Sequence, residues 1–203
     1  VQEVVDYGGV DILAAVEGIE QGLAVQSLSE RVSRHRAERL MNAVTIVEFV
    51  AGEERDVAMG EVYAEAFKTL NLEWLEKYFE LEPVDREVLW HPQALLEGGG
   101  ALLFAEVGGE VVGTCALQCH EDGGCELTKM AVTEVCQGRQ IGKRLLRAAL
   151  DRARAMGLET LFLVTNSSLT AALNLYRKHG FRVTSCGQHD KYARGDLTME
   201  LAL

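Results

Sequence analysis

Near the start of the chain, apolar residues recur at the spacing of one helix face. They are Ile12, Val16, Ile19 and Leu23. A second helical pattern covers residues 29–40, with Ser29 as its predicted N-cap. Strand-like patterning begins after Ala43, so we predict a helical N-terminal segment over residues 1–43 and a separate domain over residues 44–203. A helical pair this short cannot bury both faces, so it must pack on the main domain, on a second copy or on a preceding domain.

The following part of the chain alternates between helical and strand-like patterns. We predict strands over residues 44–50, 102–107, 111–118 and 125–132, and helical segments over residues 56–79 and 91–96. Irregular apolar spacing within 56–79 indicates two helices or a bend, and Glu82-Pro83 ends that region. Glycine pairs at 108–109 and 123–124 permit the positive φ values of tight turns. The last three strands are therefore predicted to form an antiparallel meander.

The C-terminal part adds a crossover. A helix over 141–156 has an apolar face and a largely basic opposite face, and Gly157 ends it. The short apolar run over 160–164 is typical of a buried strand in a parallel pair, which a helical crossover joins to the preceding strand. A helix over 168–179 and strands over 181–185 and 192–201 follow. The predicted fold class is α+β, a mixed sheet with one parallel pair and flanking helices.

Composition and charge narrow the function. The 203 residues include 31 acidic and 20 basic side chains, a formal net charge of −11. This deficit of positive charge argues against direct binding of nucleic acid or of an anionic lipid surface. No run of about 20 uncharged apolar residues is present, and the first residues lack the pattern of a secretory signal. We therefore predict a cytoplasmic protein without a membrane partner.

The five cysteines predict reduced thiols and no metal site. Their odd number, and their positions mostly inside apolar strand patterns, fit a reducing cytoplasm better than a disulfide framework. Cys115 and Cys119 share one face of a predicted strand but lie about 13 Å apart along it, too far to share a zinc ion. Buried, unreactive thiols are the prediction.

The segment Gln137–Lys143, with the sequence Q-G-R-Q-I-G-K, lies between a predicted strand and a predicted helix start. Backbone N–H groups and the positive end of the helix dipole suit a phosphate or pyrophosphate at such a position. A Walker loop is excluded because Gln137 stands where glycine is required and Arg144 where serine or threonine is required. The dinucleotide pattern G-x-G-x-x-G is absent as well.

This loop resembles the acyl-CoA pyrophosphate motif of the GNAT superfamily of N-acetyltransferases, Q/R-x-x-G-x-G/A. Gln137 occupies the first position and Gly142 the last, while Gln140 replaces the middle glycine. Residues 126–132 resemble the fourth strand of the same fold. The region of the chain that carries the resemblance is residues 44–203.

A second segment strengthens the resemblance. Ala172, together with L-Y-R-K-H-G-F at 175–181, looks like the A-x-x-L-Y-x-K-x-G-F segment of the superfamily. The chain is also similar to bacterial GNAT proteins that are fused behind a MarR-type winged-helix regulator. In that comparison the helices of residues 1–43 look like the tail of such a regulator.

The resemblance implies a site for acetyl-CoA as co-substrate and no metal. The backbone of the fourth strand would pair with the pantetheine amides, the loop would hold the pyrophosphate, and Asn166 would bond the pantetheine arm. The positions implied to bind acetyl-CoA are Met130, Ala131, Val132, Gln137, Gly138, Arg139, Gln140, Ile141, Gly142, Lys143 and Asn166.

It also implies two catalytic residues. Glu126 aligns with the strand glutamate that acts as general base in histone-type members, and Tyr176 aligns with the usual general acid. A carboxylate works well as a base only where burial raises its pKa or a water relays the proton. The alternatives are a glutamate that bonds neighbouring loops and a tyrosine that packs between helix and sheet.

In this fold the segment containing Trp74 and Tyr78 walls the acceptor site, and the acidic Glu82 and Asp85 there would suit a cationic amine. The aromatic residues are equally compatible with a core role. No histidine of the chain shows a recognisable ligand or triad spacing, so none is assigned a catalytic role.

The implied function is an acetyl-CoA-dependent N-acetyltransferase that acts by direct attack of a primary amine of a small molecule or protein. The alternative is a non-catalytic acyl-CoA-sensing module of a MarR-type transcriptional regulator. DNA would then be bound only through a winged helix that precedes residue 1. The apolar stripe of the N-terminal helices predicts a homodimer.

Overall fold

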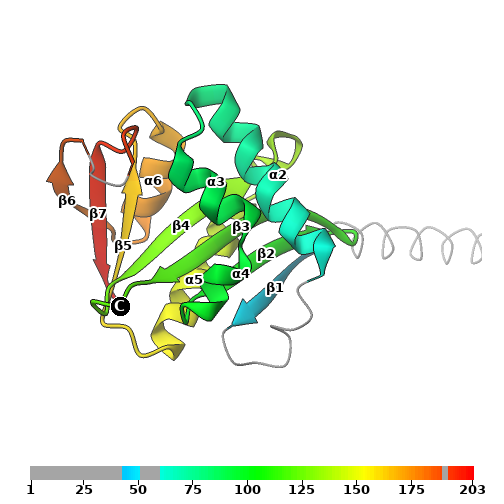
Figure 1. Ribbon diagram of the computed structural model, residues 1–203, viewed down its shortest axis with the longest axis horizontal. Coiled ribbons are helices and arrows are strands. Elements are labelled where there is room, and N and C mark those ends of the chain that lie inside the picture. Colours follow the sequence, from blue (N-terminus) through cyan, green and yellow to red (C-terminus); the bar gives the residue numbers. More distant parts are fainter. Residues whose placement is uncertain (1–42, 51–59, 189–191) are drawn as a thin grey trace, which may run out of the picture. The chain divides into compact units, whose positions relative to one another are not determined.

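The computed structural model describes residues 43–50, 60–188 and 192–203 (Figure 1). The helices predicted within residues 1–42 and the predicted helix start at residue 56 lie outside these ranges. The predicted boundary near Ala43 and the dimer that the N-terminal helices suggest therefore remain predictions of the sequence.

A seven-stranded sheet forms the centre of the domain, in the order β1-β2-β3-β4-β5-β7-β6. Its strands are Val44–Val50 (β1), Ala101–Val107 (β2), Glu110–Cys119 (β3), Cys125–Val132 (β4), Thr160–Thr165 (β5), Arg182–Cys186 (β6) and Leu197–Ala202 (β7). All neighbours are antiparallel except β4 and β5, which are parallel. The predicted meander and the single parallel pair are confirmed.

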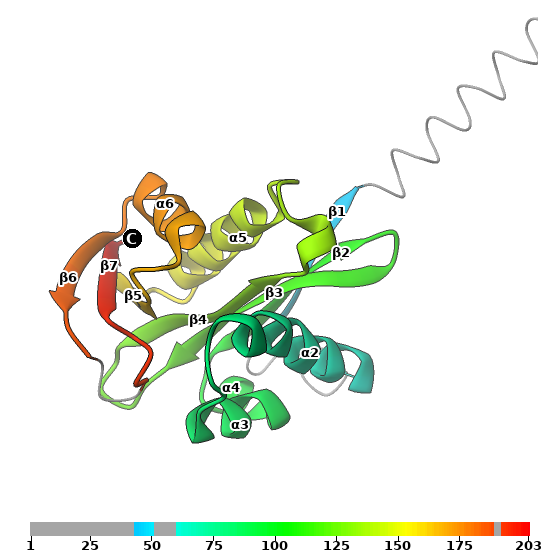
Figure 2. The ribbon, with the colours of Figure 1, turned by 90° about the horizontal axis from the view of Figure 1, so that it is seen from above.

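Helices cover both faces of the sheet (Figure 2). They are Glu61–Tyr78 (α2), Pro83–Trp90 (α3), Gln93–Glu97 (α4), Ile141–Ala155 (α5) and Thr170–Lys178 (α6). The first three lie on one face, and α5 and α6 lie on the other. No helix among the described residues combines the length and apolarity that crossing a membrane requires.

Strand alternation divides the core between the two faces. In β2, Leu102 and Phe104 pack with the cluster of α2, while Leu103 and Ala105 pack with the cluster of α5. All four side chains are fully buried. Such two-sided burial explains why the central strands read as nearly continuous apolar runs.

Three predicted details are wrong. The region around Glu82-Pro83 begins a helix instead of ending one, because proline is well accommodated at the first helical position and Glu82 and Asp85 form a capping box. The irregular pattern before it does not produce a break within 61–78, which form one helix. The strand predicted from residue 192 starts only at Leu197, and the residues before it form a loop that contacts α3.

Candidate active site

The strands β4 and β5 diverge and leave part of β4 unpaired. On one edge β4 pairs with β3 along most of its length, but among the described residues it pairs with β5 only at Glu126 and Phe162. The backbone groups beyond Glu126 therefore face an opening on the β5 side. A pocket of about 630 Å³ follows this edge and is lined by every residue from Glu126 to Val132.

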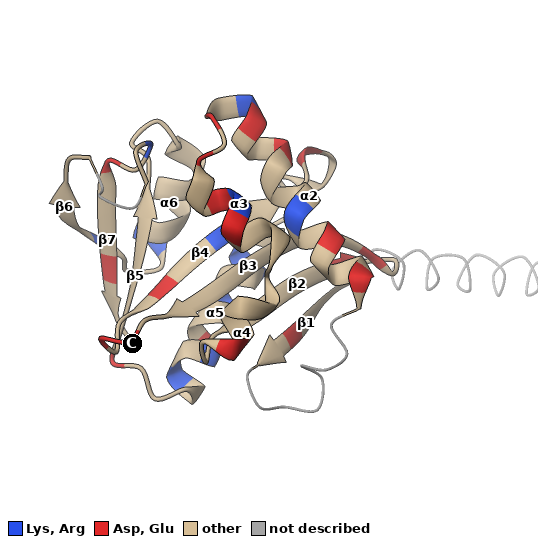
Figure 3. Ribbon diagram, viewed as in Figure 1, with Lys and Arg blue, Asp and Glu red and all other residues tan. Residues whose placement is uncertain are grey.

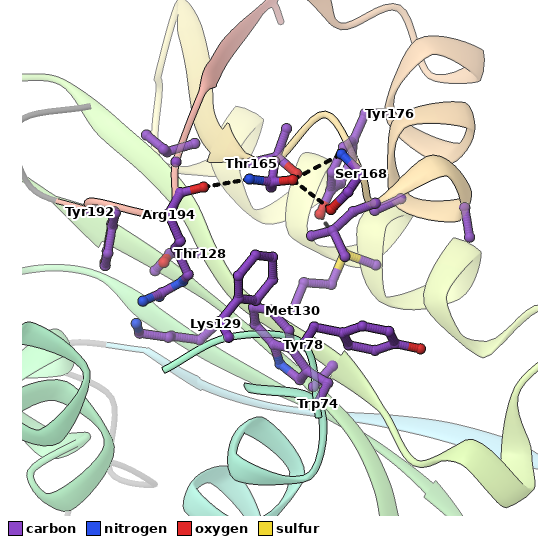
Figure 4. A pocket seen from close by; sticks show the side chains of 18 of the residues that line it. Trp74, Tyr78, Thr128, Lys129, Met130, Thr165, Ser168, Tyr176, Tyr192 and Arg194 are labelled. Carbon is purple, nitrogen blue, oxygen red and sulfur yellow. Dashed lines mark hydrogen bonds between the residues drawn. The ribbon is translucent and has the colours of Figure 1, made fainter. Parts of the chain in front are cut away.

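Four other elements wall this pocket (Figure 4). The end of α2 contributes Trp74 and Tyr78, α6 contributes Tyr176, and the loop before β7 contributes Tyr192 and Arg194. The fourth wall is the end of β5 with the loop that leads into α6. The site is thus assembled from segments that are far apart in the sequence.

A β-bulge in β4 determines which side chains enter the site. Thr128 is opposite Ala116 and Ala131 is opposite Thr114, so two residues of β4 stand across from Cys115 alone. Lys129, one of these two, has a left-handed φ of 50°. The extra residue interrupts the alternation of faces, and the Lys129 side chain points toward α3.

Lys129 belongs to a buried cluster of charges between β4, α3 and the loop before β7. Its Nζ lies 2.7 Å from Oδ1 of Asp85, and Arg194 makes two hydrogen bonds to the same carboxylate at 2.6 and 2.7 Å. Glu82 accepts a further bond from Arg194 at 3.0 Å and one from the backbone N–H of Ala193 at 2.9 Å. Figure 3 shows the acidic positions of α3 beside a basic position of β4.

The positive and negative charges within the cluster compensate one another. Burial alone would raise the pKa of Asp85, but the bonds from Arg194 and the charge of Lys129 outweigh it and hold that pKa below its ordinary value. Burial lowers the pKa of Lys129, although the neighbouring Asp85 carboxylate opposes this shift. The ring centroid of Tyr192 lies 5.0 Å from Lys129 Nζ and 4.8 Å from Cζ of Arg194. The sequence-based suggestion that Glu82 and Asp85 attract a cationic acceptor is therefore wrong, because both carboxylates are bonded to cations of the chain.

Glu126 lies at the point where β4 and β5 separate. Its side chain lines the pocket, although the residue is only 2 % exposed. Nε2 of His120 lies 3.8 Å from a carboxylate oxygen of Glu126, and the imidazole stacks on Phe162 at 5.8 Å between ring centroids. A nearly buried carboxylate beside an imidazole can accept a proton from a group that enters the pocket.

Tyr176 reaches the same pocket from α6. Its hydroxyl points at Sδ of Met130, 3.9 Å away, and its ring packs edge-on against Phe181 at 5.8 Å. Burial raises the pKa of the Tyr176 hydroxyl well above its ordinary value. The phenol therefore stays protonated at neutral pH and can donate a proton or a hydrogen bond.

The loop Gln137–Lys143 has the geometry of an anion site. Gln137 Nε2 donates to the carbonyl of Val132 at 3.0 Å, which ties the loop to the end of β4. Gly138 has a φ of 78°, and α5 begins at Ile141, so N–H groups of its first turn lack intrahelical partners. A Cβ on Gly142 would lie 3.5 Å from the Met130 methyl and 3.7 Å from Leu175, so a larger side chain there would enter the space between β4 and α6.

Gln140 occupies the position where the family motif has glycine. It is the N-cap of α5 and has φ 61° and ψ 17°, in the left-handed region. The backbone shape that glycine favours is thus kept by a residue with a Cβ. Beside the loop lies a hollow of about 560 Å³ whose lining includes Lys143, Arg147 and Lys178.

Asn166 lies at the pocket, but its amide is bonded within the protein. Nδ2 donates to the carbonyl of Arg194 at 2.6 Å, and Oδ1 accepts from the backbone N–H and the hydroxyl of Ser168 at 2.8 and 2.5 Å (Figure 4). These bonds join the end of β5 to the loop before β7. A bond from Asn166 to the coenzyme remains a prediction.

The two aromatic residues of α2 differ in burial. Trp74 is partly buried and packs edge-on against Phe79 at 6.0 Å, whereas Tyr78 is 57 % exposed. Nε1 of Trp74 is buried and has no hydrogen-bond partner among the described residues. Both rings line the pocket, so neither is a purely internal core residue.

Sequence reasoning missed the cluster of Lys129, Arg194 and Tyr192. The signal available was a lysine in the middle of a predicted strand, since a buried lysine requires a partner. Its partner Asp85 is 44 residues away in the sequence, and Arg194, which shares the same carboxylate, is 65 residues away. No local spacing connects them.

The profile of the acetyltransferase (GNAT) family matches residues 64–181. The chain belongs to this family. The matched region contains most of α2, the whole of β4, the loop Gln137–Lys143 and Tyr176. As a GNAT protein, the chain is an acyl-CoA N-acetyltransferase, and the predicted mixed sheet with one parallel pair is the GNAT fold.

Individual relatives agree with this family. An IAA acetyltransferase of Azospirillum brasilense is 38 % identical over 112 residues, which cover 54 % of this chain and 73 % of that protein. A GNAT acetyltransferase structure from Staphylococcus aureus Mu50 superposes with a TM-score of 0.67 at 20 % identity, covering 79 % of this chain and 99 % of the other. A GNAT acetyltransferase from Elizabethkingia anophelis, whose structure contains acetyl-CoA, has a TM-score of 0.56 at 23 % identity, over 79 % and 98 % of the two chains. Other curated relatives match over less than two thirds of their length.

The residues of this GNAT domain fit an acyl-CoA. The unpaired edge of β4 can hydrogen-bond an extended amide chain, and the first turn of α5 can bind a pyrophosphate. Lys143 and Arg147 supply positive charge beside that turn. Among the described residues, no group of three or more histidine, cysteine or acidic side chains is arranged to hold a metal ion.

Proposed function

We propose that the protein transfers the acetyl group of acetyl-CoA to a primary amine of a small molecule or protein by direct attack, with Glu126 as general base and Tyr176 as general acid. The observation that carries this proposal is that two buried ionisable side chains from β4 and α6 line the same pocket. Acyl transfer to an amine needs both functions, because the amine loses a proton and the departing sulfur gains one.

Binding of the donor is proposed along the unpaired edge of β4 and at the start of α5. The backbone of Met130–Val132 would pair with the pantetheine amides, and the N–H groups of Gly138–Lys143 would hold the pyrophosphate. Bound acetyl-CoA supplies the thioester that the amine attacks. Asn166 would act beside it mainly by positioning the loop before β7, since its amide is already bonded there.

A Gly142→Asp variant tests this donor site. The added carboxylate would lie near Met130 and Leu175 and would repel the pyrophosphate. We expect acetyl-CoA to bind at least about tenfold more weakly in calorimetry, in line with the loss of one or more charge-assisted contacts. Gly98→Asp, at the exposed C-terminal end of α4, is the matched control and should leave affinity unchanged. Equal affinity of wild type and Gly142→Asp would contradict the proposed phosphate site.

Glu126 is proposed to accept the proton of the attacking amine. It lies at the mouth of the β4–β5 opening, and only 2 % of the residue is exposed. The imidazole of His120 lies 3.8 Å from this carboxylate and is partly exposed. This arrangement supports a base that acts directly or through one water.

Tyr176 is proposed to donate to the departing sulfur. Its raised pKa keeps the hydroxyl protonated over the working range of pH. The hydroxyl already points at the sulfur of Met130, so it lies in a setting that accommodates a large, polarisable atom.

The acceptor is proposed to bind between the end of α2 and the loop before β7. Trp74 and Tyr78 would contact its body, and Glu126 its amino group. The cations of Lys129 and Arg194 are bonded to Asp85. This wall therefore offers aromatic surface, and its charges are already paired.

The catalytic proposal is tested with a panel of amino acids, polyamines and peptides, followed by kinetics on the best acceptor. Tyr176→Phe should lower kcat by about 10²-fold or more and leave acetyl-CoA affinity nearly unchanged. Tyr63→Phe, which removes a hydroxyl that bonds Glu106 away from the pocket, is the control and should keep kcat within about twofold, as expected of a substitution remote from the chemistry. Unchanged kcat in Tyr176→Phe would remove that residue from the mechanism.

The variant Glu126→Gln distinguishes a role of Glu126 as general base from a purely structural role. If Glu126 is the base, the variant should lose the acidic limb of the pH profile of kcat/KM. An unaltered limb would favour the role of a glutamate that bonds neighbouring loops. Coenzyme binding without turnover on any acceptor would instead favour the acyl-CoA-sensing function.

Fusion behind a MarR-type regulator, and a homodimer, are proposed from the sequence alone. The support is the similarity of the domain to fused bacterial GNAT proteins and the apolar stripe Ile12–Leu23. DNA binding, in this view, resides in residues that precede Val1.

A further inference from the structure

Cys119 and Cys125 face each other across the β3–β4 hairpin. They are register partners, and their sulfur atoms lie 3.3 Å apart. The bond from His120 N to the Gly124 carbonyl at 2.9 Å makes the next pair along the hairpin the hydrogen-bonded one. Cys119 and Cys125 therefore form a non-hydrogen-bonded pair, where opposite Cα atoms are about 4.5 Å apart. This spacing lies within the range that a disulfide spans.

The two thiols differ in access. Cys125 is 1 % exposed, and burial raises the pKa of its thiol. Cys119 is partly exposed and lies 3.5 Å from the carbonyl of Gly99. The prediction of buried thiols is therefore wrong for Cys119, which is partly exposed at the end of its strand, and for Cys186, which is exposed.

The remaining thiols have other surroundings. Cys115 points toward the carbonyl of Leu145 at 3.9 Å, Cys136 contacts Arg139, and Cys186 is exposed on β6. An oxidant can thus reach Cys119, whose nearest reactive neighbour is the thiol of Cys125.

We propose that Cys119 and Cys125 are a reversible oxidation site that hydroperoxides close into a disulfide. The peroxide oxidises the Cys119 thiol to a sulfenic acid and is reduced to the corresponding alcohol or water. The Cys125 sulfur then attacks the Cys119 sulfur, an S–S bond forms, and the hydroxyl leaves with the Cys125 proton as water. A dithiol reductant restores both thiols by exchange.

The site adjoins Glu126, the proposed general base. Cys125 precedes Glu126, and Cys119 precedes His120, whose imidazole lies 3.8 Å from the Glu126 carboxylate. Bond formation brings the sulfur atoms from 3.3 Å to about 2.05 Å apart. This pulls together the strand ends that carry the His120 imidazole and the Glu126 carboxylate. A displacement of this size at a reacting group can cost one or more orders of magnitude in rate. This effect rests on the proposed role of Glu126; the oxidation site itself does not.

The test is peptide mapping of the whole chain after treatment with hydrogen peroxide and alkylation of the remaining thiols. Cleavage after glutamate cuts at Glu121 and separates Cys119 from Cys125. In oxidised protein the two peptides should stay joined, with a mass lower by two hydrogen atoms, until a dithiol is added. Cys115 lies on the same peptide as Cys119, so the map is repeated on Cys115→Ala.

Single cysteine variants identify which two thiols form the disulfide. The linked peptides should persist in Cys115→Ala and Cys136→Ser and disappear in Cys119→Ser and Cys125→Ser. Persistence in Cys119→Ser, or a sulfinic acid at Cys119 without a linked product, would overturn the proposed site. A link from Cys119 to Cys186 of a second molecule would overturn it as well.

Activity is a separate readout. Oxidised wild type should show kcat lowered by about tenfold, with recovery on reduction, while Cys119→Ser should resist the peroxide. Linked peptides with unchanged kcat would overturn the connection to catalysis. Absence of turnover in reduced wild type would instead count against the proposed function and leave the mapping result intact.

Discussion

Gln140 shows how a single residue keeps the shape of the phosphate loop without the glycine of the family motif. It is exposed and left-handed, with a φ of 61°. A residue with a Cβ pays roughly 1–2 kcal/mol for this conformation, whereas glycine adopts it without that strain. The loop therefore retains its backbone geometry at some expense in stability.

Replacing Gln140 separately by glycine and by alanine measures this strain. Both variants remove the side chain beyond Cβ, but only glycine relieves the left-handed conformation. We expect Gln140→Gly to exceed Gln140→Ala by about 0.5–1 kcal/mol in the free energy of unfolding, because part of the relief is offset by glycine's greater freedom in the unfolded chain. Denaturant titration of the two variants provides the comparison. Equal stability would mean that the left-handed geometry is not the source of strain.

The site residues that the sequence predicts are those that belong to short local motifs. Gln137, Gly142 and Tyr176 stand in local patterns whose spacing is meaningful before the chain folds. Spacing along a strand does not pair Cys119 with Cys125, because these two residues meet across the hairpin. Local reasoning thus identified the phosphate loop but missed a contact that depends on register.

At the scale of elements, the bulge in β4 connects the sheet to α3. One extra residue aims Lys129 at Asp85, which also holds Arg194 of the loop before β7. The apolar pattern alone does not locate the bulge, because β4 is almost entirely buried and carries polar side chains at buried positions. Pro83 suggested the end of a helix, whereas it begins α3, because proline breaks a helix interior but fits the first turn. Elements were predicted well where the alternating or helical pattern of apolar residues extends over many residues.

Asp85→Asn tests whether this cluster stabilises the domain. Loss of the carboxylate leaves two buried cations without their shared partner, so we expect a loss of about 3–5 kcal/mol in the free energy of unfolding at pH 7. Since the pKa of Asp85 is lowered in the folded protein, its stabilising effect is complete above the unfolded value of about 4 and declines as pH falls below it. The difference between wild type and Asp85→Asn should therefore shrink in acid.

Calorimetric unfolding of both proteins between neutral and acidic pH measures that difference. Glu87→Gln, at an exposed position of the same helix, is the matched control and should change stability by less than about 0.5 kcal/mol. A gap between wild type and Asp85→Asn that stays constant with pH would show that Asp85 acts by shape and hydrogen bonding and not by charge.

At the scale of the whole molecule, the sheet of residues 44–203 closes its core with its own helices on both faces. The clusters around α2 and α5 contain fully buried side chains on either side of β2 and β3. The domain predicted over 44–203 therefore has a core that does not require the stripe Ile12–Leu23. The stripe lies outside the described residues, and its sequence predicts that it packs on another surface.

We expect that surface to be a second copy of the chain. Sedimentation of the full chain should give a dimer, and a chain beginning at Val44 should give a monomer, because the shorter chain lacks the apolar stripe. Replacing Ile12, Val16 and Ile19 by serine in the full chain should also give a monomer, with unfolding of the 44–203 domain unchanged. If both lengths sediment as monomers and the shorter one is markedly less stable, the stripe packs on its own acetyltransferase domain. That result would contradict the dimer, since a helix pair that stabilises its own domain has no apolar face left to join two copies.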